Sequence, residues 1–143
     1  MDPTRRAALA DAYRCTTYAA TTPVGRVEIH VGASTPLLDT LLTELAAAEW
    51  CFISACNPGS AIQTDAANEA AHTRLRAAVD AHGWPAFDGY GKGDAGAWPA
   101  ERSLLIVGCP LSDGLALAHA FGQLAIVFGR RDAPASIVWT EQS

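Results

Sequence analysis

The feature that most constrains the fold is the stretch from Trp50 to Pro58, which reads Trp-Cys-Phe-Ile-Ser-Ala-Cys-Asn-Pro. Its first part, residues 50–55, is almost continuously apolar, a pattern typical of a strand that is covered on both faces. The run then enters Asn57-Pro58-Gly59-Ser60, a cluster of residue types that favour turns. The sequence therefore predicts a buried central strand whose far end presents Asn57 at a sheet edge or cleft.

The segments around this strand carry the periodicities of strands and helices. Apolar and polar residues alternate over 26–31, which indicates a half-buried strand. Leucines recur at helical spacing over 36–45, and a longer helix is predicted between a Thr64 cap and Gly83. Two further helices are predicted over residues 112–121 and, at the N-terminal periphery, over residues 1–12.

In chain order, these segments mix strands with three main helices. Such a mixture predicts an α+β or α/β two-layer sandwich, in which about three helices pack on a mixed β-sheet. A ferredoxin-like core is the leading topology. Because 143 residues is the size of one domain, residues 1–143 are expected to form a single globular domain.

Composition and residue spacing argue against several classes of function. The chain has a net charge of −5 and its basic residues are scattered, so nucleic acid is not an expected partner. No apolar run reaches the roughly 18 residues that span a bilayer, and the N-terminus lacks the apolar segment of a signal peptide. We therefore expect a cytoplasmic protein that does not enter the membrane. The histidines and cysteines lack metal-ligand spacing, so no metal or other cofactor is expected.

Residues 88–101 are the least regular part of the chain, with four glycines between positions 89 and 96. They match neither the P-loop nor the dinucleotide-binding glycine pattern. The sequence therefore predicts a glycine-rich loop without regular structure. The loop is either a lid over a cleft or a plain exposed loop. As a lid, it would contribute Gly91, Lys92, Gly93 and Trp98.

Polar side chains lie at the ends of several predicted elements. They are Asn57, Asn68, Glu101, Ser103 and Gln123. Each alone is more often a turn former, a backbone cap or a solvated side chain than a ligand contact. Together, they could line one pocket, because binding sites place a few polar groups in an apolar wall.

Six pieces of sequence occur in a characteristic order: Trp50–Pro58, Asn68-Glu69, Gly91 through Trp98-Pro99, Glu101, Ser103–Leu105 and Phe121–Ile126. Together, they resemble the bacterial family called domain of unknown function 3293 (DUF3293), over about Tyr13 to Phe128. The chain departs from the family pattern at Cys56, where a larger residue is expected before Asn-Pro. The resemblance implies a stand-alone small domain in which the polar positions of the preceding paragraph match the family. It implies no reaction.

Two hypotheses of function follow. In the first, the chain binds a small polar, nucleotide-like ligand in a cleft near the end of the central strand. Asn57, Asn68, Ser103 and Gln123 would then bind the ligand, and a desolvated Glu101 could act as a catalytic general base. In the alternative, the chain is a protein–protein interaction or regulatory module without a small-molecule ligand. Trp84, Tyr90 and Trp98 would then be the anchors, because aromatic residues dominate binding hot spots.

Overall fold

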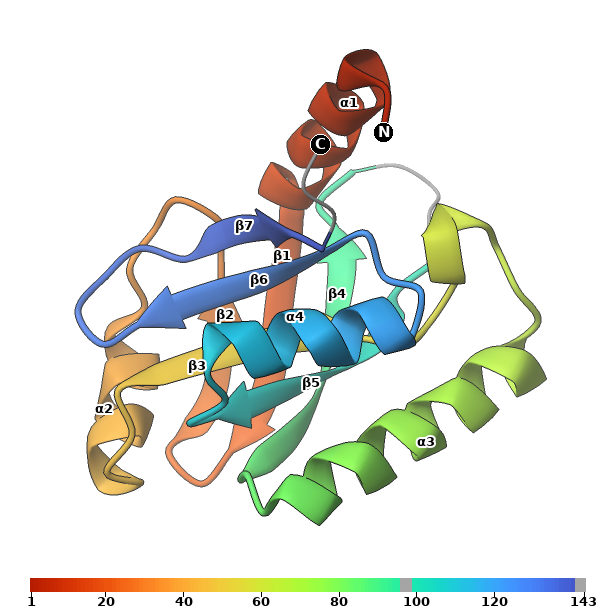
Figure 1. Cartoon of the computed structure of the whole chain (residues 1–143). Helices are drawn as coiled ribbons and strands as arrows, with labels where there is room; N and C mark the ends of the chain where they lie inside the picture. Colours follow the sequence, from red (N-terminus) through yellow and green to blue (C-terminus); the bar gives the residue numbers. More distant parts are fainter. Residues whose placement is uncertain (96–98, 141–143) are drawn as a thin grey trace.

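The computed structural model describes residues 1–95 and 99–140 (Figure 1). Its helices are α1 (Pro3–Arg14), α2 (Pro36–Glu44), α3 (Asp65–His82) and α4 (Leu111–Ala120), with a short 3₁₀ turn η1 (Pro58–Ser60). Its strands are β1 (Thr16–Thr22), β2 (Gly25–Ile29), β3 (Glu49–Ser54), β4 (Ala86–Gly93), β5 (Glu101–Val107), β6 (Ala125–Arg130) and β7 (Ser136–Trp139). The protein is therefore α+β, which is one of the two classes that the sequence predicts.

The seven strands form one curled sheet in the order β2-β1-β4-β5-β3-β6-β7. All six pairings between these strands are antiparallel, so the prediction of a mixed sheet is wrong. The sheet curls so that its two edges approach each other at one point: Val31, just after β2, forms an isolated parallel bridge with Ala135, just before β7. Backbone hydrogen bonds of 2.8 and 3.0 Å from Gly32 and Ala135 support this closure. The result is a half-barrel with an inside and an outside.

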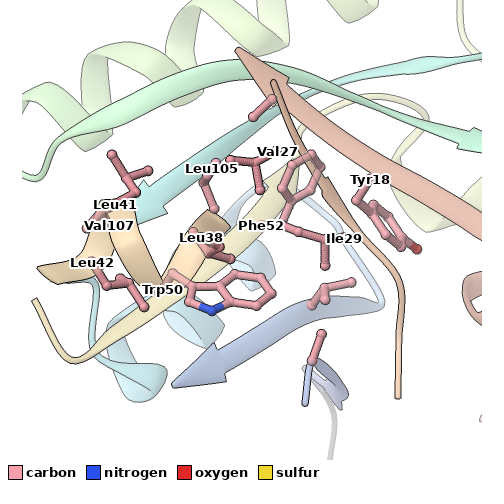
Figure 2. Packing of buried hydrophobic residues seen from close by; sticks show 13 residues of the cluster. Tyr18, Val27, Ile29, Leu38, Leu41, Leu42, Trp50, Phe52, Leu105 and Val107 are labelled. Carbon is pink, nitrogen blue, oxygen red and sulfur yellow. The ribbon is translucent and has the colours of Figure 1, made fainter. Parts of the chain in front are cut away.

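The central strand β3 is buried on both faces, which confirms its prediction. Trp50 and Phe52 point into the curl and Cys51 and Ile53 point out of it, and all four are at most 3% exposed. The cluster inside the curl, here the inner core, packs against the leucines of α2 (Figure 2). The cluster outside, the outer core, packs under α3 and α4, which lie on the same face of the sheet (Figure 1).

Helices therefore cover both faces of the sheet, which differs from the predicted two-layer sandwich. The count of about three packed helices was also too low for the described residues. The N-terminal helix α1, predicted to be peripheral, adds a fourth, because its Tyr13 packs against the inner core. Helices are needed on the inner face because the sheet curls. Its own side chains do not fill the interior, so apolar side chains from α1 and α2 pack there.

The glycine-rich segment is the main correction to the sequence-based prediction. Residues 88–93 are not an irregular loop but the second part of β4, which pairs with β1 on one side and β5 on the other. The physical reason is the close approach of β1. A Cβ atom on Gly89 would lie 2.2 Å from the carbonyl oxygen of Ala19, which is a steric clash. Only glycine, which has no Cβ atom, fits at this position. Trp98, predicted to belong to the same loop, lies outside the described residues.

Candidate functional site

A pocket of about 390 Å³ occupies the part of the half-barrel interior that α2 does not fill. Tyr18, Phe52 and Val127 belong both to the inner core and to the wall of this pocket. Its roof is α1, which contributes Leu9, Ala12 and Tyr13. The cavity, here called the α1 pocket, is thus a continuation of the inner core that side chains leave open.

Helix α1 has no fully buried residue, so apolar burial contributes little to its position. A few specific contacts hold it over the pocket. Arg5 donates a hydrogen bond of 3.0 Å to the carbonyl oxygen of Gly59. The guanidinium of Arg6 lies 4.8 Å from the ring centroid of Trp139, and the Tyr13 ring packs edge-on against the same indole. These contacts tie α1 to the turn after β3 and to the end of β7, on both sides of the pocket.

Glycines on β4 form part of the floor of the pocket. Gly91 pairs with Tyr18 on β1 and with Glu101 on β5, so these three residues form one row that faces the interior. Since Gly91 has no side chain, the Tyr18 ring can lie over it, 3.2 Å from the position that a Cβ atom would take. Gly93 continues the floor one row further. Lys92 points to the opposite face by strand alternation, so it does not join the predicted site.

Asn57 and Asn68 form a clamp beside the pocket and do not line it. The side-chain amide of Asn57 donates to Glu101 Oε2 at 2.7 Å, and its Oδ1 accepts from Asn68 Nδ2 and from the Gln63 backbone N–H, each at 2.9 Å. The Asn57 backbone N–H donates in turn to Asn68 Oδ1 at 2.9 Å. These two predicted ligand contacts are therefore occupied inside the protein, where they fix the turn and orient Glu101.

The other predicted polar residues do line the pocket. They are Glu101, Ser103 and Gln123. Glu101 and Ser103 project from β5 two residues apart, and Gln123 Nε2 donates to the carbonyl oxygen of Cys56 at 3.0 Å. Because Ser103 also pairs with Ser54 at the end of β3, the polar groups gather where β3 ends and β5 begins. Ser103 Oγ donates to the Glu101 carbonyl oxygen at 3.1 Å, which stiffens this corner.

Several pocket residues were missed by sequence reasoning. Ser54, Thr16 and the aromatic residues Tyr13, Tyr18 and Phe52 all line the cavity. One signal could have found the floor: glycine occupies every second position at 89, 91 and 93, which is the period of one face of a strand. No signal in the sequence shows that α1 folds over the pocket.

Glu101 dominates the electrostatics of the pocket. Among the described residues, it is the only Asp, Glu, Lys, Arg or His side chain in the lining. Burial raises the pKa of Tyr13 to about 12, and the negative charge of Glu101 adds to that rise. Burial likewise raises the pKa of Tyr18, with smaller contributions from Tyr13 and Glu101. The two phenols therefore remain neutral at physiological pH, and the pocket carries one negative charge.

The raised pKa of Tyr13 predicts a loss of stability in alkali. Tyrosine in the unfolded chain releases its proton near the ordinary pKa of 10.0, whereas the folded protein holds the Tyr13 proton up to about 12. This contribution to stability is complete below pH 10 and is lost as pH rises toward 12. Urea unfolding across this range should show a steeper loss for the wild type than for Tyr13→Phe. Parallel curves would contradict the assignment.

Charged side chains form a separate group on the outside of the sheet. Asp88 lies 3.4 Å from His72 Nε2, 3.9 Å from Arg76 and 4.0 Å from Arg102, and Arg102 also pairs with Glu69. This group links α3 to β4 and β5 and does not reach the pocket. In the parts of the chain that the structure describes, no three His, Cys, Asp or Glu side chains are placed to hold a metal ion.

The structure describes two of the three predicted aromatic anchors. Trp84 is half-buried against the outer core and stacks on His82 with 4.2 Å between ring centroids. Tyr90 is 53% exposed on β4, and Trp98 lies outside the described residues. Over residues 1–95 and 99–140, no helix combines the length and apolar character needed to cross a membrane.

Comparison with protein families gives a match. The model of a family described as "Protein of unknown function (DUF3293)" matches residues 53–126, which is just over half of the chain. The matched segment contains the clamp residues Asn57 and Asn68 and the pocket residues Glu101, Ser103 and Gln123. No curated protein and no solved structure matches the chain.

Proposed function

This chain belongs to the DUF3293 family of proteins of unknown function, and we propose that it binds a small ligand in the α1 pocket. The observation that carries the proposal is the pocket itself. Its volume of about 390 Å³ lies in the range of small-molecule sites. Its wall is largely apolar and aromatic, and its few polar groups gather at one corner, as such sites require for orientation.

The lining also indicates what kind of ligand fits. A nucleotide carries phosphates, which proteins bind with Arg, Lys or backbone N–H groups at a helix N-terminus. The described lining contains one carboxylate and no basic side chain. We therefore favour a ligand that is apolar over most of its surface and polar at the end that meets Glu101, Ser103 and Gln123. In this proposal, Glu101 binds the ligand and no reaction is assigned.

The proposal is tested by filling the pocket from its roof. Ala12 lines the pocket but is exposed on α1, so Ala12→Phe places a ring in the cavity without disturbing either core. Compounds that bind the wild type in a ligand-observed NMR screen of a fragment library should lose at least about tenfold in affinity with this variant. The matched control is Ala7→Phe, an exposed α1 position outside the lining, which should bind normally.

Two results would contradict pocket binding. One is a set of compounds that bind Ala12→Phe as well as the wild type, which would place their site elsewhere. The other is a screen in which nothing binds the wild type. The second result would favour the alternative of an interaction module without a small-molecule ligand.

We also infer that the segment β3-α3-β4-β5-α4-β6 is a ferredoxin-like core. Two observations support it. The four strands lie in the order β6-β3-β5-β4 with antiparallel neighbours. The connecting helices α3 and α4 both pack on the outer core, as a pair of split β-α-β units requires. An experimental structure with these helices on opposite faces would contradict the inference.

A further inference from the structure

The Glu101 carboxylate in the α1 pocket indicates which chemical class of ligand fits there. This inference rests on the function proposed above. Glu101 is half-buried, and its Oε2 accepts the 2.7 Å hydrogen bond from the Asn57 amide. That donor is neutral, so the contact orients the carboxylate without cancelling its charge. The clamp residue Asn57 is itself 5% exposed and held by Asn68 and Gln63. The pocket thus contains a carboxylate that Asn57 holds in a fixed orientation.

The groups around Glu101 respond to this charge. Tyr13, Tyr18 and Cys56 come from α1, β1 and the turn after β3. Burial is the main cause of the raised pKa of each, and the charge of Glu101 raises all three further. Glu101 is therefore close enough for its charge to act on a tyrosine at the floor of the pocket and on one at its roof. A ligand with a negative group would be repelled there, and one with a positive group would be attracted.

Aromatic rings line the pocket near Glu101. Tyr18 stacks on Tyr13 with 6.4 Å between ring centroids and meets Phe52 edge-on at 5.3 Å. The Tyr18 ring lies over Gly91, and Glu101 is the next residue in the same row of the sheet. A cation beside Glu101 would contact the carboxylate and would lie next to a neutral phenol ring. Aromatic faces attract cations, and the attraction is stronger where water is excluded.

We propose that the ligand is a small organic cation whose ammonium group is bound by Glu101 beside Tyr18 and whose apolar body lies against Phe52 and Val127. The four features that this requires are all in the lining: one carboxylate, aromatic rings, an apolar wall and no competing basic side chain among the described residues. The net charge of −5 further favours the approach of a cation.

The test compares ligands that share a skeleton and differ only in charge. One set is 2-phenylethylamine, 2-phenylethanol and phenylacetate, and a second is hexylamine, hexanol and hexanoate. Dissociation constants are measured by NMR titration with the wild-type protein. We expect each amine to bind at least about tenfold more tightly than its alcohol, because the ammonium group adds an ion pair to the hydrogen bond that both probes donate to the carboxylate. Each carboxylate should bind more weakly than the alcohol.

The variant Glu101→Gln supplies the matched control. Glutamine keeps an oxygen that can accept from Asn57, so the clamp remains while the charge is lost. In this variant, the amine should lose its preference over the alcohol, and the affinity of the alcohol, which can still donate to the amide oxygen, should fall by much less than that of the amine. Circular dichroism and the unfolding midpoint confirm that the variant is folded.

The failures of the two proposals can be told apart. If amine and alcohol bind the wild type equally and Ala12→Phe weakens both, the pocket binds ligands but the inference of a cation is overturned. The inference is also overturned if the preference for the amine survives Glu101→Gln, or if none of the probes binds. If the probes bind Ala12→Phe normally, the site lies elsewhere and the proposed function itself fails.

Discussion

The Gly89→Ala variant is expected to lose about 3 kcal/mol of unfolding free energy. Gly89 lies in β4 where β1 approaches most closely, and an added Cβ would lie 2.2 Å from the Ala19 carbonyl oxygen and 3.2 Å from Ala20 Cα. Both are backbone atoms in a strand paired on each side, so no side-chain rotation can relieve the contact. The strands must separate, and the hydrogen bonds between β1 and β4 lengthen.

Urea denaturation followed by circular dichroism measures this loss. The matched control is Gly93→Ala, which adds the same methyl group to the same face of β4, at 3.3 Å from the Ala95 carbonyl oxygen. Its cost should stay below about 1 kcal/mol, because the reduced freedom of the unfolded chain offsets a mild contact. Equal midpoints for the two variants would show that the approach of β1 does not demand glycine at position 89.

The Asn57→Ala variant is the second large expected loss, again of about 3 kcal/mol. It removes the side-chain partner of Gln63, Asn68 and Glu101 at once, at a position that is 5% exposed. It also places alanine in the left-handed conformation, because the φ angle of Asn57 is 48°. Asparagine tolerates that conformation better than alanine does.

The Asn57→Gly variant separates the two causes. Glycine loses the same hydrogen bonds but adopts the left-handed conformation freely, so it should be about 1 kcal/mol more stable than the alanine variant. Both variants should also weaken the preference for amines, since Glu101 loses the amide that orients it. Wild-type stability in both would mean that the clamp does not hold the turn, and equal losses would exclude the backbone conformation as a cause.

The helix ends show how far local sequence reasoning reaches. Thr64 accepts a hydrogen bond of 3.1 Å from the Ala67 N–H at the start of α3, and Gly83 ends that helix with a φ of 77°, as predicted. These features are recognisable because a cap depends on residues within one turn of it. The buried central strand was predictable for a similar reason, since an apolar run must be covered on both faces wherever it lies.

The glycine-rich segment shows where such reasoning fails. Several glycines in a short stretch usually indicate a loop, because glycine weakens both helices and strands. Here, the neighbouring strand β1, 70 residues away in the chain, requires glycine at position 89. Because Gly91 pairs with Tyr18 and Glu101, it lies at the floor of the pocket. The pairing partner of a strand is not recorded in its own sequence.

The sequence predicted which polar residues lie together at the candidate site, but not which of them line the pocket. All five polar residues that the sequence singled out lie at one corner of the fold, yet Asn57 and Asn68 bond to each other while Glu101, Ser103 and Gln123 line the cavity. An amide at the end of a strand can face a ligand or a neighbouring loop with the same sequence around it. Only the positions of its partners distinguish the two.

The sequence by itself determined that helices and strands are mixed, where the helices lie and which strand is central, because these follow from propensity and periodicity within a few residues. The tertiary structure alone decided that the sheet curls, that α2 fills one part of its interior, and that α1 closes over the other. Those outcomes depend on which distant surfaces meet and on how much of the interior their side chains can fill. The α1 pocket is the volume that they leave open.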